Sequence, residues 1–131
     1  MSIAAMILII NKIRGYAVQR GSKINTSLKD LYESLLRKNL YIVHRLDKDT
    51  SGILVICRNL ASHNFLSQQL QNKKFTKLYH ALVIRNIDKP TVIDEPIGRH
   101  PVNRKKMSIH INGRNAVSKI KPLTMFKKTT H

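Results

Sequence analysis

The sequence predicts an α+β fold, with a mixed, mainly antiparallel sheet and two packing helices. The 131 residues contain no internal repeat or low-complexity linker, and their pattern switches several times between strand-like and helix-like stretches. A hydrophobic content of 42% in a chain of this length is enough for the core of one domain at most. We therefore expect a single α+β domain.

Two helices are predicted, each with a polar residue able to cap its first turn. Thr26 or Ser27 would cap the first helix and Asn59 the second, because their side-chain oxygens can accept hydrogen bonds from the free amides there. Apolar side chains at helical spacing should face the core. These are Leu28, Leu31, Leu35 and Leu36 in the first helix, and Leu60, Phe65, Leu66 and Leu70 in the second.

Short apolar runs along the chain predict strands. The predicted strands are residues 3–10, 41–43, 53–57 and 75–84, and residues 107–126 are expected to form a hairpin. Gly15 and Gly21 mark a turn region, and the hairpin would turn at Asn112 and Gly113.

The charge of the chain predicts a polyanionic partner. Lys and Arg number 24 against 7 Asp and Glu, so the formal net charge is +17, far more than solubility requires. Residues 96–131 contain nine Lys or Arg and no acid, so the positive potential should grow toward the C-terminus. RNA or DNA fits this distribution better than a small ligand does. A biased genome composition is the alternative explanation.

The number of cysteines and the apolar N-terminal segment indicate the cellular compartment of the protein. Cys57 is the single cysteine, which excludes a disulfide framework and a cysteine metal site and predicts a reducing, cytoplasmic setting. The apolar run at residues 3–10 is too short to span a bilayer and has no basic residue before it. We interpret it as a buried strand, with a signal peptide as the minor alternative, and expect no membrane partner.

The polar loop at residues 44–52 is the strongest candidate for a functional site. Its sequence, His-Arg-Leu-Asp-Lys-Asp-Thr-Ser-Gly, concentrates acids, bases and hydroxyls between two apolar strands. Arg45 and Asp47 would point to the same side if strand geometry persists, so that a carboxylate and a guanidinium share one cleft. Taken alone, Asp47 could equally be the acid of a surface ion pair.

The last four residues of the loop are better explained as scaffold than as chemistry. Asp49, Thr50 and Ser51 can bond backbone amides and shape the turn. Gly52 can take a positive φ, which other residues resist.

This nine-residue loop resembles the signature of RluA-family RNA pseudouridine synthases. The resemblance extends in the right order along nearly the whole chain from Ile7 onward. It includes Asn11, Lys12, Gly15, Val18 and Gly21, and residues 77–83, 96–99 and 104–107. It implies that residues 1–131 form a partial pseudouridine synthase catalytic domain acting on ribosomal or transfer RNA, and that neither a metal nor an organic cofactor is needed.

The resemblance also implies roles for three residues. Asp47 would be the catalytic carboxylate, Arg45 would take the place of the flipped nucleotide, and Tyr79 would pack against the target uracil. Without the resemblance, Tyr79 is better explained as a core tyrosine of a strand, and Arg45 could be a phosphate clamp. Whether Asp47 attacks the ribose or removes a proton from it stays open.

The sequence departs from the family pattern in three places. It ends before a block similar to Gly-Arg-Thr-His-Gln-Ile-Arg, whose arginine pairs with the catalytic aspartate in the family, and it has no room for an N-terminal RNA-binding domain. Ile13 stands where the family usually has proline, which is a minor departure. We therefore expect no activity from the isolated chain, with the C-terminal half either encoded separately or lost. A silent RNA-binding protein and a gene remnant are the alternatives.

Overall fold

The structure of the chain, a computed structural model, describes residues 6–21 and 25–131. The chain divides into two compact units, residues 1–77 and 78–131, and each is described by itself. The predicted strand at residues 3–10 lies partly outside the described residues, and its described part belongs to the strand β1 (Ile7–Lys12). The expectation of one partial catalytic domain stays a prediction.

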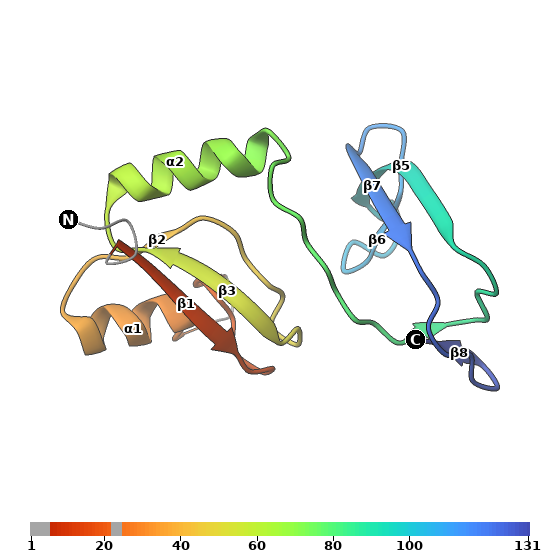
Figure 1. The fold of residues 1–131 in the computed structure, drawn as a ribbon, viewed down its shortest axis with the longest axis horizontal. Coiled ribbons are helices and arrows are strands. Elements are labelled where there is room, and N and C mark those ends of the chain that lie inside the picture. Colours follow the sequence, from red (N-terminus) through yellow and green to blue (C-terminus); the bar gives the residue numbers. More distant parts are fainter. Residues whose placement is uncertain (1–5, 22–24) are drawn as a thin grey trace. The chain divides into compact units, whose positions relative to one another are not determined.

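The first unit is built on a three-stranded antiparallel sheet. β1 pairs with β3 (Gly52–Cys57), and β3 pairs on its other side with the short β2 (Tyr41–Ile42). The order is therefore β1-β3-β2, with β3 in the centre (Figure 1). The register places Lys12, the last residue of β1, opposite Gly52, the first residue of β3. The loop at residues 44–52 thus leads into β3 at the end of β1.

The core of this unit lies on one face of the sheet, against α1 (Leu28–Leu36). Alternate residues of the strands point to this face because successive side chains of a strand alternate. The buried residues of the cluster are Ile10, Val18, Leu28, Leu40, Leu54 and Ile56. Leu8, Tyr32, Leu36 and Ile42 pack around them, half-buried. The α+β class, the antiparallel pairing and the two helices are confirmed.

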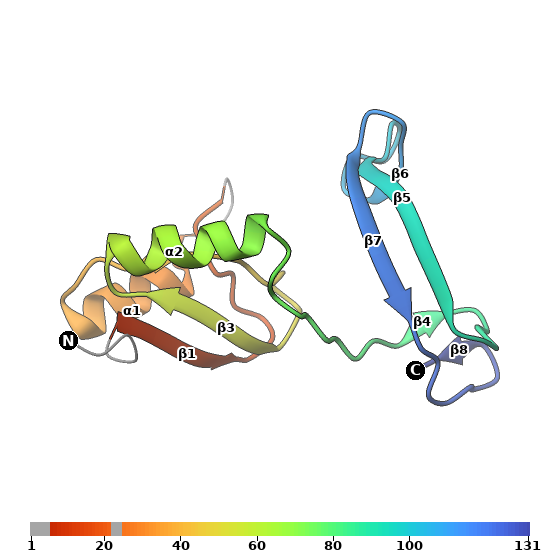
Figure 2. The ribbon, with the colours of Figure 1, turned by 45° about the horizontal axis from the view of Figure 1, so that its top comes forward.

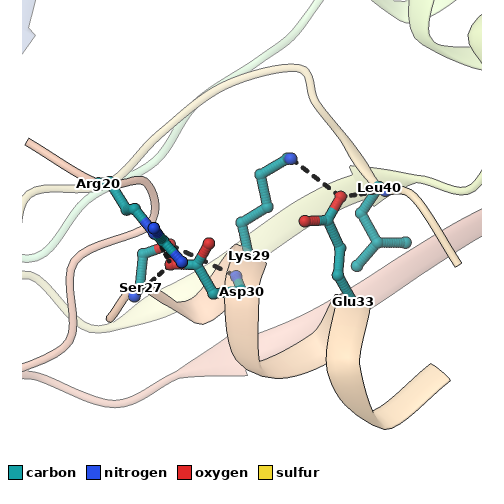
Figure 3. A network of polar contacts seen from close by, with 6 residues as sticks. All are labelled: Arg20, Ser27, Lys29, Asp30, Glu33 and Leu40. Carbon is teal, nitrogen blue, oxygen red and sulfur yellow. Dashed lines mark hydrogen bonds and ion pairs between the residues drawn. The ribbon is translucent and has the colours of Figure 1, made fainter. Parts of the chain in front are cut away.

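A reciprocal cap begins α1, as expected from Ser27 (Figure 3). The Ser27 Oγ accepts from the Asp30 amide at 3.4 Å, while the Ser27 amide donates to Asp30 Oδ2 at 2.8 Å. Two of the free amides at the start of the helix are satisfied in this way. The Arg20 Nε also donates to Asp30 Oδ2, at 2.9 Å, which joins the preceding loop to the helix.

A second polar contact joins α1 to the loop that follows it (Figure 3). Glu33 Oε1 accepts from the Leu40 amide at 2.7 Å and forms an ion pair with Lys29 at 2.9 Å. Burial acts to raise the pKa of Glu33, but the hydrogen bond from Leu40 and the charge of Lys29 outweigh it, so this pKa is lowered. Carboxylates of the helix itself thus join it to the loops on both sides.

The predicted core faces of the helices are partly wrong. Leu31 and Leu35 of α1 are exposed, because the face that packs against the sheet is the stripe Leu28, Tyr32 and Leu36, spaced by four residues. Asn59 caps α2 (Leu60–Gln71) as predicted, yet only Leu66 of this helix is buried. Leu60 and Phe65 are exposed, and Leu70 is half-buried.

The second unit contains two small antiparallel sheets. One pairs β4 (Val83–Ile84) with β8 (Thr129–Thr130), and the other has the order β6-β5-β7. Its strands are β5 (Thr91–Arg99), β6 (Met107–Ile109) and β7 (Arg114–Ile120). The predicted strand at residues 75–84 is therefore wrong except for its last two residues.

The predicted hairpin at residues 107–126 is also wrong, because β6 and β7 do not pair with each other. Both pair with β5, on which Ile97 faces Ile109 of β6 and Arg114 of β7. The turn between β6 and β7 passes so close to β5 that a Cβ on Gly113 would lie 2.5 Å from the Ile97 carbonyl carbon. Glycine is thus required here by a close backbone approach rather than by a hairpin turn. None of the described helices is long and apolar enough to cross a membrane.

We expect the Asp30 carboxylate to stabilise the first unit in a pH-dependent way. The hydrogen bond from Arg20, followed by those from Ser27, lowers the pKa of Asp30 from 3.8 to about 2. Because the folded pKa lies below the unfolded one, the stabilisation is complete above about pH 4 and is lost as the pH falls toward 2. Asp30→Asn should therefore lower the urea midpoint near neutral pH and converge with the unsubstituted chain near pH 2.

Circular dichroism at 222 nm checks this, because both helices belong to the first unit. Asp88→Asn, a substitution of an exposed acid in the second unit, is the control. A difference between Asp30→Asn and the unsubstituted chain that stays constant from neutral pH to about pH 2 would contradict the assignment.

Candidate active site

The loop at residues 44–52, called the aspartate loop from here on, connects β2 to β3 beside the end of β1. Gly52 ends the loop with a φ of 125°, the positive value predicted for it. A residue with a Cβ would be strained in this conformation, so glycine lets the chain turn from the loop into the central strand. The loop is therefore placed by the pairing of β1 with β3.

A buried lysine from β1 holds the aspartate loop. Lys12 is only 1% exposed, and its Nζ donates to the carbonyl oxygens of Ile13 at 3.1 Å, Lys48 at 3.0 Å and Thr50 at 2.6 Å. An ammonium group has three N–H donors, and here each has an acceptor. Two of the three acceptors belong to the loop, so this side chain clamps it to the end of β1.

Backbone hydrogen bonds complete the clamp. The Gly15 amide donates to the Lys48 carbonyl at 2.8 Å, and the Thr50 amide donates to the Asp47 carbonyl at 3.1 Å. The first bond joins the loop to the turn after β1, and the second closes the turn on itself. The predicted scaffold role of this part of the loop is thus carried by backbone groups and by Lys12. The position of Asp47 is set through its own backbone.

Burial alternates along the first part of the loop. Leu46 is buried, while Arg45 and Asp47 on either side of it are exposed. This is the alternation expected if strand geometry continues beyond β2. Leu46 anchors the segment, and the guanidinium and the carboxylate are both accessible from solvent. Arg45 and Asp47 are therefore both exposed residues of the same loop, and their sharing of one cleft stays a prediction.

His44 fixes the start of the loop against β3. Its Nε2 accepts from the Val55 amide at 3.0 Å, so the ring is neutral with its proton on Nδ1. Burial lowers the pKa of His44, and the nearby positive charge of Lys77 lowers it further. Both effects favour the neutral ring that this hydrogen bond requires. His44 therefore acts as a structural acceptor at the start of the loop that carries Asp47.

Tyr79, the third predicted site residue, lies in the second unit, in the segment before β4. It is 56% exposed and belongs to no strand, so the alternative of a core tyrosine in a strand is wrong. An exposed ring is available for stacking on a base. Its place in one site with Arg45 and Asp47 stays a prediction.

The sequence identified Lys12 only as one of the residues that resemble the family, and no structural role was predicted for it. The signal was present in the strand, because Leu8, Ile10 and Lys12 follow one another at the period of two that marks a single face. A lysine at the inward end of such a row must find acceptors when it is buried. A tight polar loop, rich in backbone carbonyls, supplies them.

The arrangement presents a carboxylate and a guanidinium to a ligand on a hydrogen-bonded polar turn. The carboxylate of Asp47 can act as a nucleophile or as a base, and Arg45 can pair with a phosphate or fill the space of a displaced group. No group of three or more His, Cys, Asp or Glu in the described part of the chain could hold a metal ion.

Comparisons with known proteins point to one family. The family described as RNA pseudouridylate synthase matches residues 6–131. "Ribosomal large subunit pseudouridine synthase D" of Pseudomonas aeruginosa is 39% identical over 131 residues, which cover 95% of this chain and 41% of that protein. The protein of the same name from Buchnera aphidicola is 42% identical, with 95% and 42% covered. That of Escherichia coli strain K12 is 33% identical, with 95% and 40% covered.

A solved structure has the same fold. "Human RNA Pseudouridylate Synthase Domain Containing 4" matches with a TM-score of 0.70 and 22% identity, over 95% of this chain and 53% of the human one. At this identity the likeness concerns the fold alone. The chain spans about two fifths of the length of the curated relatives described above.

We expect Lys12→Met to destabilise the first unit by about 3 kcal/mol or more, because two loop carbonyls lose a charged donor in a buried position. The matched control is Lys48→Met, which removes an exposed ammonium from the same loop and should cost at most about 0.5 kcal/mol. Urea unfolding followed at 222 nm measures both. Equal costs for the two variants would refute the clamp.

Proposed function

Because the chain belongs to the RNA pseudouridylate synthase family, we propose that it is part of an enzyme that isomerises uridine to pseudouridine, with Asp47 as the catalytic carboxylate. The observation that carries the proposal is the aspartate loop itself. It holds an exposed carboxylate on a turn clamped by a buried lysine, within a chain that matches the family almost from end to end. A rigid backbone under an accessible acid is what a positioned catalytic group requires.

The reaction explains the residue types of the site. Forming pseudouridine requires the glycosidic bond to break, the base to turn and a bond to form through carbon, so the base must leave its stack and still be retained. Asp47 would act on the ribose, and Arg45 would occupy the space that the flipped nucleotide vacates. Tyr79 would hold the detached uracil by stacking, which is worth about 1 to 3 kcal/mol per base.

We propose ribosomal RNA as the substrate, in a cytoplasmic setting. Support comes from the relatives, which are named as large-subunit ribosomal enzymes, and from the net charge of +17. Cationic side chains neutralise phosphates and release counterions, which gives affinity for any RNA. Selection of one uridine would then depend on surfaces around the loop.

We further propose that catalysis needs regions of the enzyme outside residues 1–131, which the relatives carry in the rest of their length. The chain spans about two fifths of its relatives, and Asp47 is exposed to solvent. An acid that reacts at a flipped nucleotide needs a site from which water is largely excluded. The cover, and an arginine to pair with the carboxylate, would come from those regions.

Binding of structured RNA by this chain should weaken steeply as salt rises, because each phosphate that the protein neutralises releases counterions. Replacing Arg104, Lys105 and Lys106 by glutamine should reduce the slope of log affinity against log salt by about one for each phosphate that is no longer neutralised. Asp47→Asn should leave that slope almost unchanged or raise the affinity. Filter binding or fluorescence anisotropy at several salt concentrations measures this. An affinity for RNA that does not change with salt concentration would refute the proposed electrostatic binding. A large loss of affinity in Asp47→Asn would mean that the loop has a structural role.

We expect no measurable pseudouridine from the isolated chain, and activity after the C-terminal half is supplied. The assay measures base isomerisation on bulk ribosomal and transfer RNA by the chain alone and with the C-terminal part of the P. aeruginosa relative. The control is the complemented pair carrying Asp47→Ala, in which activity should be abolished. Turnover by the chain alone would contradict the proposal that catalysis needs regions outside residues 1–131. Activity that survives Asp47→Ala would contradict the role of Asp47.

A further inference from the structure

A basic pocket lies at one end of the first unit, between the end of α1 and the start of α2. It has a volume of about 600 Å³, which is within the usual range of ligand pockets. Three cationic side chains line it, Arg37 and Lys38 from the α1–β2 connection and Arg58 from the β3–α2 connection. Figures 1 and 2 show both connections at the same end of β3, opposite the aspartate loop. The pocket is therefore separate from the candidate active site.

Hydrogen bonds hold the backbone that carries these cations. Arg37 ends α1 in the left-handed conformation, with a φ of 49°, and the Lys38 amide donates to the Glu33 carbonyl at 3.3 Å. The Arg58 amide donates to the Met6 carbonyl at 2.8 Å, where β1 and β3 are paired. The cationic side chains thus start from backbone that the fold already orders.

The lining of the pocket is positive overall. Its carboxylate, Glu33, accepts from the Leu40 amide at 2.7 Å and pairs with Lys29 at 2.9 Å, so its charge is already compensated. The three cationic side chains therefore outweigh it, and two of them, Arg37 and Lys38, are exposed. Guanidinium and ammonium groups gathered in this way bind phosphate, the guanidinium through paired N–H donors.

The other lining residues favour a nucleotide over an acidic peptide or a free phosphate. The half-buried Tyr41 ring packs against the His63 ring, whose centroid lies 6.0 Å from its own. A ring held in this way can stack on a base. Asn39 and Asn59 add side-chain amides, which can hydrogen-bond to a ribose hydroxyl or a base edge. Cationic groups beside an aromatic ring are the combination that binds single-stranded RNA.

We propose that this pocket is a second RNA-binding site, which holds one nucleotide of the substrate strand away from the aspartate loop. The phosphate would lie among Arg37, Lys38 and Arg58, and the base would lie against Tyr41. The inference rests on the proposed function, in which RNA is the substrate, and adds a place where the strand is held apart from the reacting uridine.

The length of β3 sets the distance between the two sites. The strand has six residues that rise about 3.3 Å each, so the pocket and the aspartate loop would be roughly 20 Å apart. At the spacing of a stacked strand, about 3.4 Å per phosphate, roughly six nucleotides would join them. The pocket would therefore contribute to substrate selection at a point several nucleotides from the modified uridine.

The test measures the affinity for an oligouridylate of about twelve nucleotides, which could reach both sites, by fluorescence anisotropy at several salt concentrations. The pocket variant carries Arg37→Gln and Lys38→Gln. The matched control carries Lys73→Gln and Lys74→Gln, at the far end of α2. Both pairs are exposed, lie at the end of a helix and begin with a residue of positive φ.

We expect the pocket variant to bind about tenfold more weakly, with a salt slope reduced by about 0.7 for each phosphate that is no longer neutralised. The control should stay within about twofold of the unsubstituted chain, since its lysines lie outside the pocket. Tyr41→Leu separates the base from the phosphate. It removes the stacking surface but no charge, so the affinity should fall about fivefold or more while the salt slope stays unchanged.

Nuclear magnetic resonance of the unsubstituted chain gives a readout that does not depend on the folding of a variant. Amide signals of residues 37–41 and 58–60 should shift when the oligouridylate is added. Unshifted signals there, or equal losses of affinity in the pocket variant and the control, would overturn the site. An unchanged affinity in Tyr41→Leu would overturn the placement of the base.

Two further outcomes separate this site from its alternatives. Polyglutamate that displaces the oligouridylate as well as an RNA of equal charge does would assign the pocket to acidic polypeptides and overturn the proposal. Pocket-dependent RNA binding by a chain that shows no isomerase activity, even with the C-terminal part of the P. aeruginosa relative, would overturn the proposed function and leave this site standing.

Discussion

A single buried ammonium group connects the apolar sheet of the first unit to its polar loop. Taking the charge of Lys12 out of water is costly unless every N–H finds an acceptor. The carbonyls of a tight turn have the converse need, because they cannot all bond within the turn. The three hydrogen bonds of Lys12, two of them to carbonyls of the loop, meet both needs at once. The geometry of the loop therefore depends on the register that puts Lys12 opposite Gly52.

Features set by local chemistry could be predicted from the sequence, and features set by distant pairing could not. Ser27 and Asn59 cap their helices as expected, because capping joins groups within three residues of each other. The positive φ of Gly52 was predictable for the same reason. The pairing of β6 and β7 with β5 was not, since neighbours in sequence favour a hairpin, whereas the longer β5 offers both strands a partner. The clamp by Lys12 joins residues that are 36 and 38 positions apart.

The errors in the helix faces have a common physical origin. Apolar residues at helical spacing were expected to be buried, and Leu28 and Leu36 are at least half-buried. Leu31 and Leu35 have the same character but lie on the flank of α1, beside the unpaired edge of β1. The helix carries apolar residues around more of its surface than the sheet covers, so their spacing alone could not separate the buried stripe from its exposed flank.

The aspartate loop separates the positioning of its carboxylate from the exclusion of water around it. The clamp fixes where Asp47 lies without any contribution from outside the first unit, so its position does not wait for a partner. Exclusion of water is a different requirement, and an exposed carboxylate does not meet it. Positioning the acid and excluding water from it are thus separate requirements, and the clamp by Lys12 meets only the first.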